Sequence, residues 1–204
     1  MSRNTIKIID EATALLWKTD VIDRLRLMEM ISDPMEQDLI RMLRPNYKPK
    51  AHMLLDLDIN HTDAVFLRKG MAKLYIVYAD GSYHILHIWI ENEIIVLYEM
   101  FRKRLKNTKY YIQLIEDAEL VSISIDCMEE IYNKYPVAEK LTNHVLIHKD
   151  AHRLKQMEIL GYKDKSKRPA MFEKMFPEFC FRLTNEDRAA FLGTGESTLF
   201  RGKS

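Results

Sequence analysis

Residues 50–126 carry a repeated pattern of short runs rich in β-branched and aromatic residues, each closed by turn residues about ten positions apart. The Asp80-Gly81 pair matches a two-residue hairpin turn, and Lys69-Gly70 marks another tight turn. The expected strands lie at 54–58, 64–67, 73–78 and 83–90; Glu91-Asn92-Glu93 breaks the next run, and strands at 110–115 and 120–125 follow. A count of about seven or eight short strands predicts an antiparallel jelly roll or small barrel, not a parallel sheet.

Helical sequence flanks this β region on both sides. Residues 1–48 place apolar side chains at helical spacing, and Pro34 is expected at the first position of a second helix. The segment 45–49 should end the helical region. After the strands, a short helix at 128–135 precedes a long one from Pro136 to about Leu160. At 1.5 Å per residue the long helix spans about 40 Å. Helices of that length usually bury an apolar stripe against a partner, which predicts a homodimer.

The last twenty residues or so read as two short helices joined by a tight turn. Thr184 is a good N-cap, and Gly193 is the residue best able to end the first helix in a left-handed conformation. The second helix would run from Glu196 to Arg201 with Leu199 as its inward anchor. Helix, glycine turn, helix is the arrangement in which the second helix enters the DNA major groove. The same pattern also fits an idle helical corner that binds nothing.

Composition narrows the class of protein. The net charge is +1, but residues 149–204 carry 12 Lys/Arg against 8 Asp/Glu, a net of +4. A basic C-terminal third suits a small DNA-reading module. Cys127 and Cys180 stand alone and cannot complete an iron–sulfur or zinc knuckle site. With no apolar run near 18 residues and no signal peptide, we expect a cytoplasmic protein with no membrane partner.

Five segments in this order resemble a transcription regulator of the Crp/Fnr superfamily, in the branch common among Bacteroidetes. They read VFLRKGMAKLYIVYADG, WIENEIIVLYEMF, IQLIEDAELVSIS, MEEIYNKYP and MFEKMFPEF…LTNEDRAAFLGTGESTLFR. The resemblance covers nearly the whole chain. It implies an α+β fold with N-terminal helices, an antiparallel β-roll of the cyclic-nucleotide-binding type, a long dimerisation helix and a C-terminal winged helix-turn-helix. The corresponding domains are 1–135 (sensor), 136–162 (dimerisation helix) and 163–204 (DNA binding).

The resemblance also assigns contacts with double-stranded DNA. Ser197, Thr198 and Arg201 would lie on the base-facing side of the second helix, and Thr184 near a phosphate. Arg and the hydroxyl residues are suited to base edges, whereas Arg188 and Lys203 would add phosphate contacts. The family often has Glu where Ser197 stands, which leaves the base preference open. The predicted set is Thr184, Arg188, Glu196, Ser197, Thr198, Arg201 and Lys203.

In the effector region the sequence departs from that of the nucleotide-binding relatives. Val96-Leu97 stands where those relatives have Gly-Glu for the ribose, and Thr108-Lys109 stands about where they have Arg-Ser for the cyclic phosphate. We therefore expect no cofactor and no cyclic AMP, but a different small-molecule effector or none. Residues 102–106 are interpreted as a solvated loop. The predicted pocket is Val96, Leu97, Tyr98, Glu99, Thr108 and Lys109.

His144, His148 and His152 share one face of the long helix, a spacing that can chelate a metal, but no Cys or carboxylate completes a set. We predict a partly exposed polar face and no metal site.

Without a nucleophile–base pattern or paired carboxylates, the chain is expected not to be an enzyme. The hypothesis is a homodimeric transcription regulator that reads two half-sites. The alternative is a ligand-sensing protein whose DNA module is degenerate.

Overall fold

The computed structural model describes residues 9–201, the side chain of Arg201 excepted. The chain forms two compact units, each described by itself below. The first comprises Met1–Lys73 and Trp89–Leu146, and the second Leu74–Ile88 and Ile147–Ser204. The three-part division into sensor, dimerisation helix and DNA-binding domain stays a prediction.

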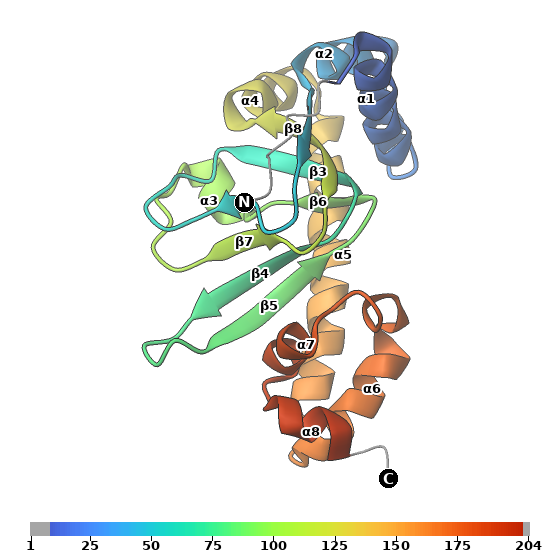
Figure 1. The fold of residues 1–204 in the computed structure, drawn as a ribbon. Helices are drawn as coiled ribbons and strands as arrows, with labels where there is room; N and C mark the ends of the chain where they lie inside the picture. The colour runs from blue at the N-terminus through green and yellow to red at the C-terminus, as the bar shows by residue number, and fades with distance from the viewer. Residues whose placement is uncertain (1–8, 202–204) are drawn as a thin grey trace. The chain divides into compact units, whose positions relative to one another are not determined.

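In the first unit, two helices precede the strands (Figure 1). Helix α1 (Glu11–Arg26) is capped by Asp10, whose side chain accepts a hydrogen bond of 2.8 Å from the Thr13 N–H. Helix α2 (Asp33–Met42) begins with Asp33-Pro34, so Pro34 lies in the first turn, one position later than predicted. The unit ends with α4 (Ile125–Lys134) and the first ten residues of α5 (Val137–Leu160). The predicted long helix is therefore confirmed.

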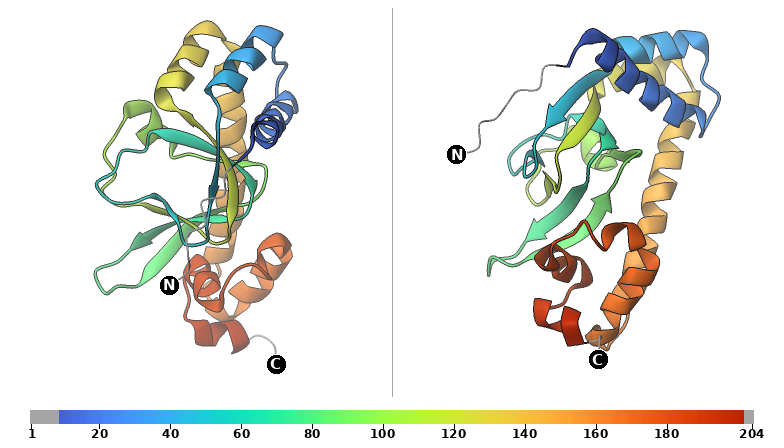
Figure 2. Two further views of the ribbon diagram at one scale, coloured as in Figure 1. Left: turned by 45° about the horizontal axis from the view of Figure 1, so that its top comes forward. Right: turned by 45° about the vertical axis from the view of Figure 1, so that its right-hand side comes forward.

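The strands of the first unit pair antiparallel, as expected. One sheet has the order β1-β8-β3-β6, and a second pairing joins β2 to β7. Figure 2 shows the same strands from two further directions. Their bounds are β1 Arg44–Lys48, β2 Met53–Leu55, β3 Asp63–Lys69, β6 Glu93–Ile95, β7 Tyr111–Leu114 and β8 Ala118–Ser124.

The structure corrects or extends three sequence interpretations. Segment 45–49 follows the end of the helical region as predicted, and it also belongs to a strand, because β1 pairs with β8 along its whole length. β1 is the outermost strand, where the missing N–H of Pro45 is tolerated. The predicted break at 91–93 is a turn at 91–92, and the run that follows it begins with β6 at Glu93. Arg102 and Lys103 are the last turn of helix α3 (Tyr98–Lys103), not a loop.

One face of the β1-β8-β3-β6 sheet forms the core of the first unit. Phe66 of β3 and Val121 of β8 are paired partners, and both are buried. They belong to the same apolar cluster as Trp17 of α1 and Met35 of α2. Burial of such large side chains contributes about 1.5–3 kcal/mol each, so the N-terminal helices are held by this face of the sheet.

Gly70 gives the first testable prediction. Its φ is +108°, and a Cβ added there would lie 2.8 Å from the carbonyl oxygen of Asp117. Gly70→Ala should therefore lower the free energy of unfolding of the first unit by about 1–3 kcal/mol. Denaturant unfolding followed by tryptophan fluorescence reports it, because Trp17 and Trp89 both lie in this unit. Gly81→Ala is the control, since its φ is also positive but no atom lies within 4 Å; because Gly81 lies in the second unit, its unfolding is followed by circular dichroism. An equal loss in both variants would contradict the predicted clash.

The second unit contains a strand hairpin and the C-terminal helices. Strand β4 (Ala72–Val77) starts at the end of the first unit and pairs with β5 (Tyr83–Trp89), as predicted. The N–H of Tyr78 donates to the Ser82 carbonyl at 2.8 Å, so residues 79–81 form a loop longer than the predicted two-residue turn. The helical elements after α5 are 3₁₀ helix η1 Lys165–Lys167, α6 Arg168–Met175, 3₁₀ helix η2 Pro177–Phe179, α7 Asn185–Leu192 and α8 Glu196–Arg201.

Four phenylalanines hold the C-terminal helices together. Phe172 lies in α6, Phe176 directly after it, Phe179 in η2 and Phe191 in α7, and all are almost completely buried. Phe176 and Phe179 stack with ring centroids 5.0 Å apart, and Phe191 meets Phe176 edge-on at 5.5 Å. Aromatic pairs in these geometries contribute about 0.5–1.5 kcal/mol beyond their burial. The short helices of this module therefore depend on their shared aromatic core.

Candidate nucleic-acid interface

Helices α7 and α8 and the turn between them form as the sequence predicts. The hydroxyl of Thr184 accepts a hydrogen bond from the Asp187 N–H at 3.1 Å and so caps α7. Gly193 ends α7 with φ 58° and ψ 43°, the left-handed conformation that glycine adopts without steric cost. Leu199 is buried and anchors α8. The predicted helix-turn-helix geometry is therefore confirmed at both caps and at the anchor.

The polar residues predicted to read DNA lie on the outside of this pair. Glu196 and Ser197 of α8 are exposed, Thr198 is half-buried, and Thr184 is exposed at the start of α7. The side chain of Arg201 and the whole of Lys203 lie outside the described residues. Short hydroxyl side chains on an exposed helix of this kind can approach base edges or phosphates.

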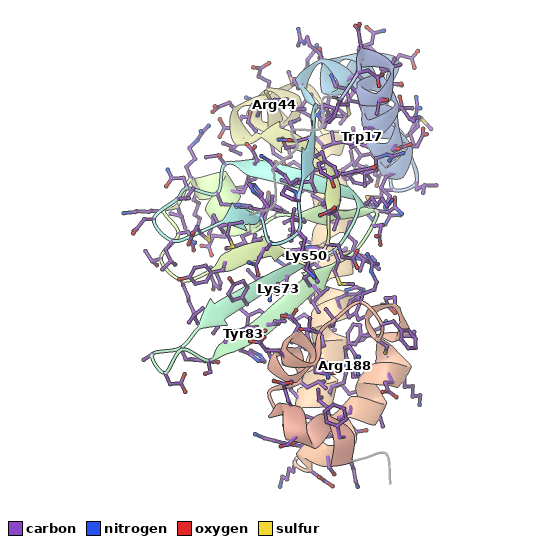
Figure 3. All side chains as sticks on the ribbon, viewed as in Figure 1. Trp17, Arg44, Lys50, Lys73, Tyr83 and Arg188 are labelled. Carbon is purple, nitrogen blue, oxygen red and sulfur yellow. The ribbon has the colours of Figure 1, made fainter. Side chains whose placement is uncertain are left out.

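Arg188 has a different environment from the one predicted. Its guanidinium Nη2 donates to the Cys180 carbonyl, and its Nε is buried without a hydrogen-bond partner among the described residues. Figure 3 labels this side chain. A phosphate contact by Arg188 would have to share or replace the bond to Cys180. Its role toward DNA stays a prediction.

Sequence reasoning missed a group of three lysines. Lys163, Lys165 and Lys167 are all exposed, and the η1 segment that contains two of them packs against α8. If α8 enters a major groove, as the sequence predicts, lysines in this position would lie near the flanking phosphates. The signal was present in the sequence as the run KDKSK, which we name the η1 lysines after the 3₁₀ helix.

Arg168 supports the module from inside. Its guanidinium donates to four carbonyl oxygens, those of Leu160, Tyr162, Leu192 and Gly193, at 2.8–3.3 Å. Leu160 is the last residue of α5, and Leu192 is the last residue of α7. Because the final carbonyls of a helix have no partner within it, one buried arginine satisfies the ends of two helices. Nothing in the sequence distinguished Arg168 from its basic neighbours.

A second internal contact joins the hairpin to α7. The hydroxyl of Tyr83 donates to the carboxylate of Asp187 at 2.9 Å (Figure 3 labels Tyr83). Burial, together with this hydrogen bond, raises the pKa of Tyr83 well above its ordinary value. The phenol therefore stays protonated and remains a donor. Asp187, three residues after the N-cap Thr184, is a buried support of α7.

The predicted effector residues are not gathered into one pocket. Val96 is buried, and the Leu97 N–H donates to His61 Nε2 at 3.0 Å at the start of α3. Glu99 is ion-paired with Lys103 at 2.7 Å. Thr108 and Lys109 are exposed on the segment before β7. Of the six residues, only Val96 and Tyr98 line a cavity of the first unit, which lies between helices and sheet.

The three helix-face histidines do not act as one group. His144 is hydrogen-bonded to Glu29 at 3.0 Å. The rings of His148 and His152 lie 5.2 Å apart, and His152 lies 5.7 Å from His87. Burial lowers the pKa of His152 and lowers that of His87 further, so both rings are neutral at pH 7. Their environment is an aromatic one, since His152 also meets Phe176 edge-on.

These elements define an α+β protein in which an antiparallel β-roll region is followed by a long helix and a helix-turn-helix. No protein-family model and no curated protein matches the chain. Among solved structures, it resembles a protein of Eubacterium rectale assigned to the Crp/Fnr family of transcriptional regulators, with TM-score 0.69 and 17% identity over 84% of this chain and 82% of that one. None of the described helices is long and apolar enough to cross a membrane.

Two further structures extend this comparison. FixK2 of Bradyrhizobium japonicum gives a TM-score of 0.67 at 14% identity, covering 78% of this chain and 82% of that one. The c-di-GMP responsive regulator CLP of Xanthomonas campestris gives 0.68 at 11% identity, covering 84% and 89%. The chain therefore has the fold of the Crp/Fnr regulators, and the predicted resemblance is confirmed for the fold.

Proposed function

We propose that the chain is a cytoplasmic transcription regulator of the Crp/Fnr type that binds double-stranded DNA through α7 and α8. The observation that carries the proposal is the exposed polar face of α8, held on a helix pair that is capped at Thr184 and Gly193. The η1 lysines beside it add positive charge. Ser197 and Thr198, with Arg201, would contact base edges, while Thr184 and the η1 lysines would contact phosphates.

The active species would be a homodimer. On the second half of α5, Ile147, Leu154 and Met157 are 68%, 58% and 56% exposed. Their spacing of seven and three residues matches the a and d positions of a coiled-coil seam. We name these three residues the α5 seam. Pairing of two copies along the α5 seam would cover this apolar stripe and present two α8 helices to half-sites about one helical turn apart.

The β-roll region would act as an effector domain that does not bind cyclic AMP. Val96 is buried and apolar, and Leu97 uses its N–H for His61. Neither side chain offers the acceptor that a ribose needs. The chain would therefore not be a cyclic-AMP sensor, and like the regulators that it resembles in fold it would not be an enzyme. The alternative remains a ligand-sensing protein with a degenerate DNA module, and the inward contact of Arg188 is the observation that favours it.

A gel-shift titration tests the DNA-binding proposal. Sites are first selected from a random duplex library at low salt, where the electrostatic contribution is largest. The wild-type protein should bind the selected DNA more tightly than random DNA. Arg201→Ala should remove about 1–3 kcal/mol of that preference by losing a base contact. No binding to any duplex at low salt would rule out the DNA-reading role and leave the alternative.

Lys165→Ala should act differently from Arg201→Ala. A phosphate contact carries no sequence information, so this change should weaken binding to selected and random DNA about equally. It should also reduce the slope of log K against log salt by about 1. Lys50→Ala, an exposed lysine of the first unit labelled in Figure 3, is the matched control and should leave both quantities unchanged. If Lys165→Ala and Lys50→Ala behave alike, the η1 lysines do not contact DNA.

A further inference from the structure

The first unit contains a cavity of about 100 Å³ between its helices and the β1-β8-β3-β6 sheet. The sheet contributes residues of β3, β6 and β8, and the remaining lining comes from α1 to α5 and the segments beside them. Protein interiors normally leave few voids larger than a water molecule. The space lies beside the core of one unit and is partly open, so a small molecule has a path into it, and a largely apolar space of this size needs an occupant or a reason.

Two alanines make room for this space. Ala64 of β3 and Ala138 of α5 both line the cavity, and Ala138 is completely buried. Around them the side chains are large and apolar, including Phe66, Phe101 and Leu141. A larger residue at either alanine would fill the space. The cavity thus depends on small residues at two positions on different elements.

The lining determines what chemistry the cavity accepts. Apart from Tyr98, Tyr132 and Thr142, every lining side chain is apolar, and none is charged. A charged ligand would lose its hydration there without gaining a counter-charge. An apolar cavity of a similar order, about 150 Å³, is known to stay dry and bind a benzene-sized molecule. The occupant should therefore be uncharged and about as large as one aromatic ring.

One polar position in the lining has a defined hydrogen-bond direction. Thr142 Oγ1 donates to the Ala138 carbonyl at 3.1 Å, and the Tyr132 hydroxyl lies 2.8 Å from Thr142 Oγ1. Because the Thr142 hydrogen is already used, Tyr132 must be the donor of the second bond. Burial raises the pKa of Tyr132, which keeps that hydrogen in place. Both oxygens therefore retain lone pairs and can only accept a further hydrogen bond.

We propose that this cavity binds a small uncharged molecule, about one aromatic ring in size, whose single hydroxyl or N–H group donates to the Tyr132–Thr142 pair. Four lining residues belong to α5, namely Ala138, Leu141, Thr142 and Val145. The occupant would thus contact the helix that carries the α5 seam further along. An effector role for the ligand rests on the proposed function, whereas the binding itself does not.

Thermal unfolding of the full chain tests the binding, with tryptophan fluorescence reporting the first unit. Three probes share one ring: 4-methylphenol, toluene and 4-methylbenzoate. At about tenfold excess over Kd, 4-methylphenol should raise Tm by about 2–5 °C. At the same concentration as 4-methylphenol, toluene should give a smaller rise because it offers no donor. At that concentration 4-methylbenzoate should give no rise because it carries a charge and no donor. No rise with either uncharged probe, or an equal rise with 4-methylbenzoate, would overturn the proposal.

Variants distinguish binding of the probes in the cavity from binding elsewhere on the surface. Ala138→Leu should abolish the shift with both uncharged probes, whereas Ala12→Leu, the same change at an exposed position of α1, should leave the shifts unchanged. Where Ala138→Leu fails to fold, Ala64→Val fills the cavity from a strand that suits a β-branched residue. Shifts that persist in a folded cavity-filling variant would place the probes elsewhere and refute the site.

The polar position has its own test. The double variant Tyr132→Phe/Thr142→Val removes both oxygens with little change of shape, a replacement that leaves no buried group unpaired between the two side chains. The toluene shift should remain, and the advantage of 4-methylphenol over toluene should disappear. A retained advantage would contradict the assigned hydrogen bond. Failure of the gel shift alone would overturn the DNA-reading role and leave these ligand results intact.

Discussion

Arg168→Ala is expected to lower the free energy of unfolding of the second unit by about 3–5 kcal/mol and to abolish DNA binding. Arg168 is buried and donates to the carbonyls of Leu160, Tyr162, Leu192 and Gly193. Each buried carbonyl left without a donor costs about 1–3 kcal/mol, reduced where water can enter. The negative ends of two helix dipoles also lose their positive partner. The helices around the turn before α8 should then separate.

Circular dichroism and tryptophan fluorescence measure this effect together. Loss of the C-terminal helices lowers the helical signal, while Trp17 and Trp89 should report an unchanged first unit. Arg168→Lys should recover only part of the stability, because a single ammonium group cannot reproduce a planar fork that reaches four carbonyls. Arg153→Ala is the control, since Arg153 is exposed and paired with Asp150 at 2.8 Å. Equal stability of Arg168→Ala and Arg153→Ala would show that the helix ends do not need this side chain.

The caps of α7 could be predicted because they depend on local chemistry. A threonine directly before a helix and a glycine directly after it are favoured as caps by their own chemistry. Both caps lie where the sequence indicated. The role of Arg168 could not be predicted, because it depends on the ends of two helices that are 32 residues apart in the chain, at Leu160 and Leu192. The strand β1 was missed for the same reason, since its pairing with β8 is a long-range interaction.

The same difference between local and long-range interactions applies to the candidate site. The outward position of Ser197 follows from helical periodicity about the buried Leu199. The inward contact of Arg188 with Cys180 follows from the fold of the preceding loop, which no local pattern encodes. The effector region shows this most clearly, because Val96 lines a cavity while Thr108 is exposed. The resemblance to nucleotide-binding relatives placed Val96 and Thr108 in one pocket. In the structure the course of the backbone puts them in different places.

Leu154→Glu is expected to convert the proposed homodimer into a monomer and to reduce affinity for two-half-site DNA by at least about 100-fold. Leu154 is 58% exposed at the centre of the α5 seam, so in a dimer a pair of carboxylates would meet in an apolar interface and lose hydration. In the monomer the glutamate is solvated, and stability should change by less than about 0.5 kcal/mol.

Leu16→Glu provides the matched control for the seam, because Leu16 of α1 is 54% exposed and lies in the other unit. It should leave both the mass and the gel shift unchanged. Sedimentation equilibrium gives the mass, and the gel shift with one and with two half-sites gives the affinity. A pair of half-sites binds tightly only when its two readers are joined, because the second contact then forms at high effective concentration. Leu154→Glu should therefore equalise binding to one and two half-sites. A Leu154→Glu protein that remains dimeric would show that the exposed stripe of α5 is not the dimer contact, whatever its DNA affinity.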